Sequence, residues 1–413
     1  MASVLSSPAI LIIFLPISII AAIVLGILAA CKKVRKVFLF IPLGVGIFSI
    51  LAFFVFTMDK FMPDTLFGDN GDRGPGIPGS SGLEYVVSQT DTWDGTSDTS
   101  WYQAGASELY IDTAEKFAGL SALSSSGKTF SGVKISIRVN MDLCGKEWDP
   151  INDFEGEIYG NGAVISNFVI KSSAGTYWHG LFAKQSGTVN NLHLREFTVN
   201  GKLNTGSFAG FNSGTIVNCT ANGEVKATKS FTDMDGGYAV YCGGIAGNNY
   251  GTIKNCSFNG EVSSTASSQY FNVTVKSYCG GIAAYNSGTI DLSYSLGKVT
   301  ATSKGSNNKV GCYSYSGGVC AFLGGTVKNS FAGGEVKVVV DAHKYGYDTG
   351  IASGGVYGIR SANGVLENSY VLDGQIKDVV YIDDAGTLLT TDPAPTLSLS
   401  EIESRLGKTF SIK

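Results

Sequence analysis

The stretch CGGIAGNNYGTIKNCSFNGEV, from Cys242 to Val262, is the unit that decides the fold of this chain. Its features recur every 37 residues between Gly206 and Ile376 as a Gly-Gly pair, a Gly-Thr-Ile/Val step and a Gly-Glu/Lys-Val step. The pairs begin at Gly243, Gly280, Gly317 and Gly354, the second steps at Gly214, Gly251, Gly288 and Gly325, and the third at Gly223, Gly260, Gly297 and Gly334. Three markers with one period predict a solenoid, in which each repeat is one structural layer.

Each repeat contains short apolar pieces separated by Gly and Asn. Pieces this short, rich in β-branched residues and bounded by turn formers, predict strands. Three strands per turn would wind into a parallel β-helix, an all-β fold whose layers lie roughly 4.8 Å apart, so that equivalent side chains stack. We expect three inward columns: Phe208, Ile245, Ile282, Val319 and Val356; Ile216, Ile253, Ile290 and Val327; and Val225, Val262, Val299 and Val336.

The rest of each unit, such as residues 263–278, is an excursion with alternating polarity. We interpret it as a hairpin or extended arm that leaves the coil. Successive arms would then pair edge to edge and form a fourth, outer sheet. Tyr241, Tyr278 and Tyr315 end three of these arms in register.

Composition argues against several classes of function. Charged residues make up 15% of the 413 residues and the net charge is −4, which gives no basic face for nucleic acid. No HExxH, CxxC, GxGxxG or Walker loop occurs, and His179, His193 and His343 share no metal-ligand spacing. We therefore expect no cofactor, no metal and no catalytic residues.

Four of the eight cysteines fall at equivalent repeat positions. Cys219 and Cys256 form one pair and Cys242 and Cys279 another. Neighbouring parallel strands place Cα atoms near the roughly 4.4–6.8 Å that a disulfide needs. The pairs are therefore either two disulfides between layers or two ladders of buried free thiols, because small apolar Cys also suits a tight interior.

The first 58 residues predict a two-span membrane anchor. Residues 9–30 and 37–57 are apolar and long enough to cross a bilayer as helices, which takes about 20 residues. Four cations between them, from Lys32 to Lys36, should hold the link in the cytoplasm. Residues 9–57 would then lie in the lipid bilayer, and everything after Met58 would be extracellular. A signal peptide, or a lipoprotein box or acylation at Cys31, is the alternative.

Residues 59–82 form the predicted stalk. Glycine recurs every third residue at Gly68, Gly71 and Gly74, and again at Gly76, Gly79 and Gly82 after a slip of one residue. This run resembles collagen, where only Gly fits the axis of a triple helix. It predicts either a homotrimer whose stalk begins here or a flexible linker.

Residues 83–178 should hold an N-terminal cap and the first coils. A helix over 110–120, with Asp112 and Glu115 as a capping pair, would cover the open first layer. A strand ending in Asp-Leu-x-Gly at Asp142 follows, then Trp-x-Pro-Ile at Trp148, Phe-x-Gly at Phe154 and Gly-Asn-Gly at Gly160. Residues 377–413 should form a C-terminal cap, with a short helix from Ser398 that Gly407 stops.

These motifs, with the repeats over residues 179–376, resemble bacterial surface proteins that carry GLUG repeats. The resemblance covers roughly residues 105–376. It implies a right-handed β-helix displayed on a cell surface, often in adhesion, and it supplies no active site. The long arms and the tandem membrane spans depart from the family pattern.

Other repeated positions have structural or binding interpretations. Glu224, Glu261, Lys298 and Glu335 would form an ion-pair ladder on a solvated face, and Asn218, Asn255, Asn329 and Asn368 would stack at tight left-handed turns. Tyr241, Tyr278 and Tyr315, with Tyr270 nearby, either form a flat binding face for glycans or a protein ligand or pack the arms onto the solenoid. Asn272 is the candidate for glycosylation in a eukaryotic host.

The sequence thus predicts a membrane-anchored, surface-displayed β-helix that acts without enzymatic activity. Its expected roles are adhesion, partner binding or lateral self-assembly into a surface structure, for which arms with long edges are suited. A polysaccharide-binding or polysaccharide-degrading β-helix is one alternative, which clustered carboxylates or cations in a groove would favour. A viral or filament subunit is another.

Overall fold

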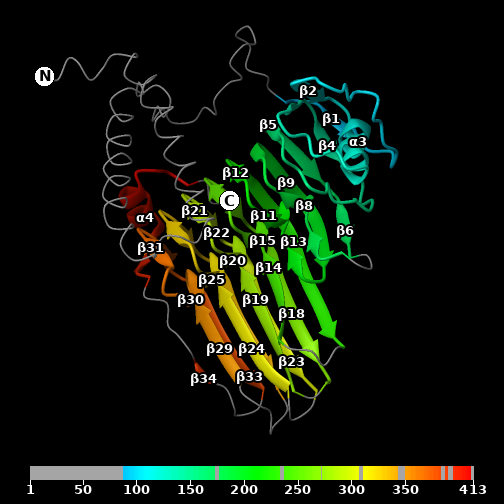
Figure 1. Cartoon of the computed structure of the whole chain (residues 1–413). Helices are drawn as coiled ribbons and strands as arrows, with labels where there is room; N and C mark the ends of the chain where they lie inside the picture. The colour runs from blue at the N-terminus through cyan, green and yellow to red at the C-terminus, as the bar shows by residue number, and fades with distance from the viewer. Residues whose placement is uncertain are drawn as a thin grey trace, which may run out of the picture. The chain divides into compact units, whose positions relative to one another are not determined.

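The computed structural model describes residues 87–172, 176–232, 237–270, 272–306, 310–342, 349–382, 387–388 and 394–410. Here the chain forms a parallel β-helix built from three groups of strands, which we call sheets A, B and C (Figure 1). The predicted membrane spans and stalk lie outside the described residues. Neither described helix is long and apolar enough to cross a membrane.

Sheets B and C each take one strand from every repeat. Sheet B contains β8 (Phe182–Gln185), β11 (Ala209–Asn212), β15 (Ala246–Asn249), β20 (Ala283–Asn286), β25 (Cys320–Leu323) and β30 (Tyr357–Arg360). Sheet C contains β7 (Trp178–His179), β10 (Asn204–Thr205), β14 (Gly237–Gly243), β19 (Val273–Gly280), β24 (Val310–Gly317), β29 (Thr349–Gly354) and β34 (Thr387–Leu388).

Sheet A wraps the remaining sides of the coil. Its N-terminal strands are β1 (Thr90–Thr92), β2 (Glu108–Ile111), β3 (Lys134–Ile137), β4 (Asn140–Asp142), β5 (Glu157–Ser166), β6 (Val169–Lys171) and β9 (Thr188–Gly201). The repeats add β12 (Thr215–Val217), β13 (Thr220–Phe231), β16 (Thr252–Lys254), β17 (Ser257–Phe258), β18 (Glu261–Ser268), β21 (Thr289–Asp291), β22 (Tyr294–Ser295) and β23 (Lys298–Gly305). The last coils add β26 (Thr326–Lys328), β27 (Phe331–Ala332), β28 (Glu335–Asp341), β31 (Val365–Glu367), β32 (Tyr370–Leu372), β33 (Ile376–Ile382) and β35 (Thr396–Leu397).

The predicted columns are confirmed. Ile253 pairs in register with Ile216 on one side and Ile290 on the other, and Val262 does the same with Val225 and Val299. The amide of Ile245 donates to the carbonyl of Ile282 at 2.9 Å, and that of Ile282 to Val319 at 2.8 Å. These side chains are fully buried, so each coil supplies one apolar layer to a core that no single coil could build.

The Gly-Gly pair marks the corner where sheet C passes into sheet B. A Cβ atom on Gly244 would lie 2.1 Å from the carbonyl oxygen of Gly281 in the next coil. The backbones of successive coils therefore approach too closely for any side chain at this position.

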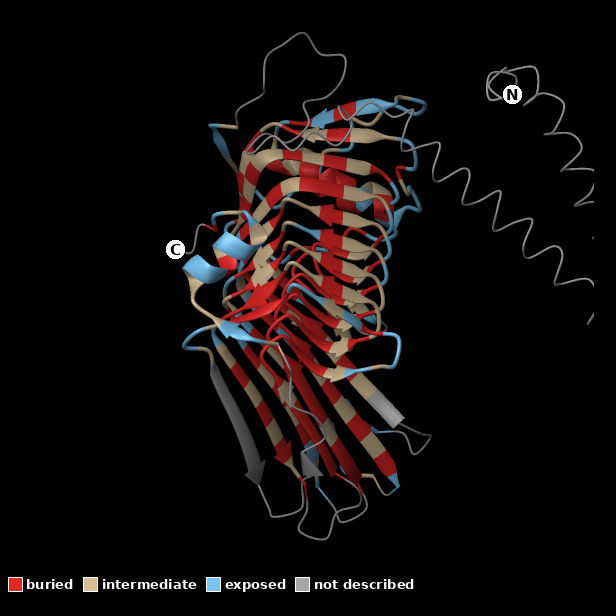
Figure 2. Cartoon of the chain, turned by 90° about the vertical axis from the view of Figure 1, so that its left-hand side faces the viewer, coloured by how far each residue is buried: buried red, intermediate tan, exposed pale blue. Residues whose placement is uncertain are grey.

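The arms are extended strands that pair edge to edge with their neighbours, as one form of our prediction had it, and they are not hairpins. β18 pairs with β13 and β23 in sheet A, whereas β19 pairs with β14 and β24 in sheet C. The two strands of an arm face one another across a thin interior, where the hydroxyls of Ser264 and Ser277 lie 2.5 Å apart. Alternate residues of both strands are buried (Figure 2). The arms therefore extend two sheets of the coil, and no separate fourth sheet of hairpins exists among the described residues.

At the N-terminal end, helix α3 (Ala114–Ser125) packs on the loop that precedes sheet B. The ring of Phe117 stacks on that of Trp148 with centroids 4.9 Å apart, and Ser121 Oγ donates a hydrogen bond to the carbonyl of Asp149 at 2.7 Å. Ile151 of the same loop bridges to Phe182 in the first strand of sheet B. The helix thus lies at the N-terminal end of this sheet.

The cap of α3 differs from our prediction. The N-cap is Thr113, whose side chain accepts a hydrogen bond from the amide of Lys116. Asp112 forms an ion pair with Lys116 at 2.7 Å, and Glu115 accepts a hydrogen bond from the amide of Asp94. Both carboxylates of the predicted pair are therefore engaged elsewhere.

Helix α4 (Leu399–Leu406) has the predicted ends, and the surface on which it packs was not predicted. Ser398 and Glu401 form a capping box, and Gly407 ends the helix in the left-handed conformation. Phe410, just beyond the helix, meets the rings of Tyr294 and Phe331 edge-on, with ring centroids 5.4 and 4.9 Å apart. Helix α4 therefore packs on the outer flank of sheet A, against side chains of three coils (Figure 2). β35, which precedes the helix, pairs with β32 in the last coil.

The asparagine column is confirmed as a left-handed turn. Asn218, Asn255, Asn329 and Asn368 have φ angles of 57°, 52°, 51° and 42°. Asn255 Nδ2 donates to Asn218 Oδ1 at 2.7 Å. A second, fully buried ladder was not predicted: Asn212 donates to Asn249, and Asn249 to Asn286, each at 2.7 Å. Stacked amides satisfy one another along the axis.

Leu292 occupies the same turn with a φ of 48°, where Asn stands in the neighbouring coils. A left-handed Leu is strained by roughly 1–2 kcal/mol, whereas Asn tolerates this conformation better. We predict that Leu292→Asn raises the free energy of unfolding by about 1 kcal/mol. Urea denaturation followed by circular dichroism would measure the gain. The reverse exchange in the next coil, Asn329→Leu, should lower stability, and equal midpoints for the two variants would contradict the prediction.

Candidate functional site

The candidate site is a set of aromatic rings on the outside of the coil, where sheets C and B meet. On sheet C, Tyr241, Tyr278 and Tyr315 pair in register, as predicted. Their ring centroids lie 4.9 and 4.8 Å apart and the rings are stacked. Val240 and Cys242, on either side of Tyr241, point into the core, so the tyrosine column faces outward.

A second column runs beside it on sheet B. Tyr285 stacks on Phe322 with centroids 4.7 Å apart. One coil earlier the equivalent residue is Asn248, which carries no ring, and Tyr250 fills the gap. The Tyr250 centroid lies 5.2 Å from that of Phe211 and 5.8 Å from that of Tyr285.

The two columns join at Tyr241 and Tyr285, whose rings meet edge-on with centroids 5.9 Å apart. The backbones of sheets B and C also crowd at this junction, since a Cβ on Gly247 would lie 2.6 Å from the amide nitrogen of Thr205. We call the combined surface the aromatic corner; it consists of Phe211, Tyr241, Tyr250, Tyr278, Tyr285, Tyr315 and Phe322. It is a continuous set of ring contacts over four coils.

Exposure differs among the rings of the corner. Tyr250 is 50% exposed, Tyr241, Tyr278 and Tyr285 are half-buried, and Tyr315 is buried. Burial raises the pKa of Tyr278 and, with the phenol groups of Tyr285 and Tyr250 as further causes, that of Tyr241. The pKa of Tyr250 is raised by burial and by Tyr285, with which it shares a hydrogen bond. These hydroxyls therefore stay neutral donors at physiological pH.

Tyr270 does not belong to this surface, which corrects our prediction. It follows β18 at the far end of an arm, where it is partly buried against the main core. Conversely, sequence analysis missed Phe211, Tyr250, Tyr285 and Phe322. Phe211, Tyr285 and Phe322 occupy one repeat position, with Asn248 between the first two, and their spacings of 74 and 37 residues were a usable signal.

The cysteine pairs are thiol ladders in this structure, and the disulfide interpretation is wrong here. Cys219, Cys256, Cys242 and Cys279 are all free and buried. Cys242 Sγ donates to the carbonyl of Val225 at 3.5 Å, and Cys279 Sγ to that of Val262 at 3.4 Å. Burial, and then the neighbouring thiol, raises the pKa of Cys219 and Cys242, so these thiols are protonated and unreactive in the folded state.

The remaining polar candidates stay apart from the corner. Asn272 is exposed at an arm turn with a φ of 58°. In the charged column, Lys298 and Glu335 lie 3.8 Å apart on the surface. Burial lowers the pKa of His179 to about 4 and also lowers that of His193, while His343 lies outside the described residues. Within the described ranges, no group of three or more His, Cys, Asp or Glu could hold a metal ion.

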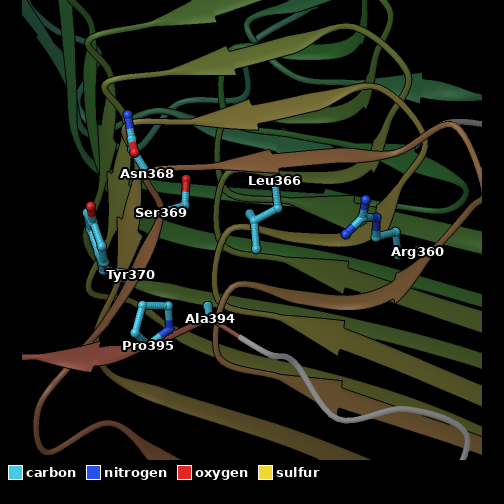
Figure 3. Close-up of a pocket in the computed structure, with 7 residues that line it drawn as sticks. All are labelled: Arg360, Leu366, Asn368, Ser369, Tyr370, Ala394 and Pro395. Carbon is cyan, nitrogen blue, oxygen red and sulfur yellow. The ribbon is translucent and has the colours of Figure 1, made fainter.

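A hollow of about 340 Å³ lies at the last coils, beside β30, β31 and β32 (Figure 3). Its lining residues are Arg360, Leu366, Asn368, Ser369, Tyr370, Ala394 and Pro395. Arg360 Nε is bound to the carbonyl of Gly364 at 2.8 Å, and Ser369 Oγ to that of Glu367 at 2.8 Å. These polar groups serve local turns, so the hollow offers little to a ligand.

Comparison with solved structures supports the fold class. A Bacteroides ovatus protein described as a putative immunoglobulin A1 protease superposes with a TM-score of 0.51 and 22% identity, over 72% of this chain and 86% of that one. Identity this low shows a shared parallel β-helix and nothing about activity. No family model matches the chain.

Among curated proteins, 79 residues of this chain are 35% identical to halomucin from Haloquadratum walsbyi. The match covers 19% of this chain and spans about 1% of halomucin. The fold and the surface thus define a parallel β-helix protein with an external aromatic ladder.

The thiol ladders generate a prediction about reactivity. In a Cys31→Ser variant without reductant, only the exposed Cys144 should react with a thiol reagent in the folded protein. All seven described thiols should react once the chain is unfolded, because the other six are buried. Counting thiols with Ellman's reagent before and after denaturation checks this. Fewer than seven in the denatured sample would reveal a disulfide and restore the other interpretation.

The tyrosine column generates a prediction about pH. The folded-state pKa of Tyr278 is raised, so its contribution to stability is complete below the ordinary pKa of about 10 and is lost as pH rises above it. We predict that the free energy of unfolding falls above pH ~10 in the wild type and falls less in Tyr278→Phe. Urea titrations at stepped pH would measure both. Tyr110→Phe, at a ring 51% exposed, is the matched control and should leave the wild-type profile unchanged.

Proposed function

We propose that this chain is a surface-displayed, non-enzymatic binding protein. Residues 9–57 anchor it in a membrane, the β-helix lies on the extracellular side, and the aromatic corner meets a partner in adhesion. The observation that carries the proposal is the corner itself. Aromatic residues, Tyr above all, are enriched at recognition surfaces. This outward-facing set is contiguous over four coils, and Tyr250 in it is half exposed.

Two further points support the proposal. The local similarity to halomucin agrees with display at a cell surface, although it covers a small part of both chains. Charges in the repeats stand in regular surface columns, as with Lys298 and Glu335, which suits a structural role better than acid–base chemistry. Membership of the GLUG-repeat family, the right-handed sense of the coil and a trimeric or laterally assembled form belong to the same proposal.

Surface display is testable through Cys144, the exposed thiol among the described cysteines. On intact cells that express the full chain, a membrane-impermeant maleimide should label the wild type and fail to label Cys144→Ser. In Cys144→Ser cells, label should appear at Cys31 only after permeabilisation, because the link between the spans is predicted to be cytoplasmic. Labelling of Cys144 only in permeabilised cells would contradict extracellular display.

A further inference from the structure

The aromatic corner combines two kinds of surface. At one end, three tyrosine rings come together, since the ring centroid of Tyr285 lies 5.9 Å from that of Tyr241 and 5.8 Å from that of Tyr250. Asn248 Nδ2 lies beside them and donates to Asn204 Oδ1 at 3.0 Å. At the other end the surface is apolar, where Tyr315 packs with Ala321, Ala352, Tyr278, Tyr313 and Ile359.

From Asn204 to Ala352 on sheet C and from Phe211 to Ile359 on sheet B, the two columns carry no charged side chain, and Lys184 precedes Phe211 in the sheet B column. On sheet C the outward positions read Asn204, Tyr241, Tyr278, Tyr315 and Ala352. On sheet B they read Phe211, Asn248, Tyr285, Phe322 and Ile359. Lys276 borders the corner, with its ammonium 5.7 Å from the ring centroid of Tyr313. Lys184 lies at the N-terminal end, paired with Asp153 at 3.1 Å.

Such a surface suits a ligand that is uncharged, rich in hydroxyl groups and apolar on its ring faces. Within each column the ring faces cover one another, so a ligand reaches edges and hydroxyls, and it meets the most open ring at Tyr250. The four coils from Phe211 to Phe322 span roughly 15 Å at the usual strand spacing. A surface that repeats along one axis fits a polymer that also repeats.

We infer that the aromatic corner binds a neutral, linear polysaccharide laid along the axis of the coil. This inference rests on the proposed binding function and names its ligand class. Tyr250 is the outermost contact, and the hydroxyls of Tyr241 and Tyr285 hydrogen-bond sugar hydroxyls. At the apolar end, the ring edges of Tyr278 and Phe322 contact the C–H groups of the next sugar units.

Calorimetric titration of the full chain in detergent with cellohexaose, mannohexaose and N-acetylated chitohexaose tests this inference. At least one of these neutral probes should bind, with an affinity that rises from disaccharide to hexasaccharide and does not change with salt, because no charges are paired. Tyr250→Ser should weaken binding by about tenfold, as expected for an exposed aromatic contact. Tyr285→Phe keeps the ring and removes the hydroxyl, and should weaken binding to a smaller extent.

Tyr110→Ser and Tyr177→Ser are matched controls, since both rings are about as exposed as Tyr250 and lie outside the corner. Their affinities should equal that of the wild type. Failure of all three neutral probes, or equal losses in control and corner variants, would overturn the inference. Tyr250-dependent binding of a polygalacturonate oligomer or a polyproline peptide would also overturn the ligand class while leaving the binding function in place. The labelling of Cys144 reports display independently of all these outcomes.

Discussion

Parallel pairing between coils, in which paired residues from Asn204 to Leu323 lie opposite the residue 37 positions on, is the constraint on which the rest of the structure depends. The hydrogen bonds of every strand go to neighbouring coils, so one coil has neither a complete set of backbone partners nor a core of its own. In the last coils this interval lengthens twice, each time at a turn, and it reaches 41 residues where Glu335 pairs with Ile376. Leu323 still pairs with Arg360, but Thr326 pairs with Val365, 39 residues on, so two extra residues are taken up between β30 and β31. Insertions are therefore tolerated in turns, whose residues do not pair with the neighbouring coil.

Much of the coil could be predicted because each repeat position has the same structural requirement in every coil. Ile282 must fill a closed layer, Gly244 must carry no Cβ, and Asn255 must adopt a left-handed turn. The residue type at a single position is enough to indicate each of these requirements. The capping box at Ser398 was predictable for the same reason, because it lies within four consecutive residues.

The arms and the corner were harder to predict because their defining contacts depend on neighbours that the sequence does not fix. Alternating Ser, Ala and Val in β18 is equally compatible with a hairpin and with two facing sheets, since both bury every second residue. Tyr250 joins its ladder from a position two residues away from Asn248, so no strict period contains it. For the cysteines, the 37-residue spacing predicts that the two residues of each pair lie side by side. That proximity is the same for a disulfide and for two free thiols, so the spacing does not distinguish them. The packing of helix α4 on the flank of sheet A was not predicted, because its buried face is small and contains Ile402 as its one fully buried side chain.

The same register that builds the core also orders the outside of the molecule. Once Cys242 and Cys279 are stacked inward, Tyr241 and Tyr278 must stack outward, and their ring contacts add stability to the pairing that placed them. A recognition surface of this kind needs no dedicated loop. The spacing of its aromatic rings is the spacing of the coils. We therefore propose that its ligand also has a repeating structure.

The central claim is that each coil pairs in register with the coil 37 residues on. The distance between outward-facing threonines of neighbouring coils tests this claim most directly. In a background without Cys31 and Cys144, Thr252→Cys with Thr289→Cys places two thiols on adjacent coils, roughly 4.8 Å apart at Cα, whereas Thr252→Cys with Thr326→Cys doubles that separation. The short cross-linker dibromobimane should bridge the first pair and become fluorescent, and should leave the second unbridged. Equal bridging of both pairs, or bridging of the second alone, would contradict a coil that advances one layer every 37 residues.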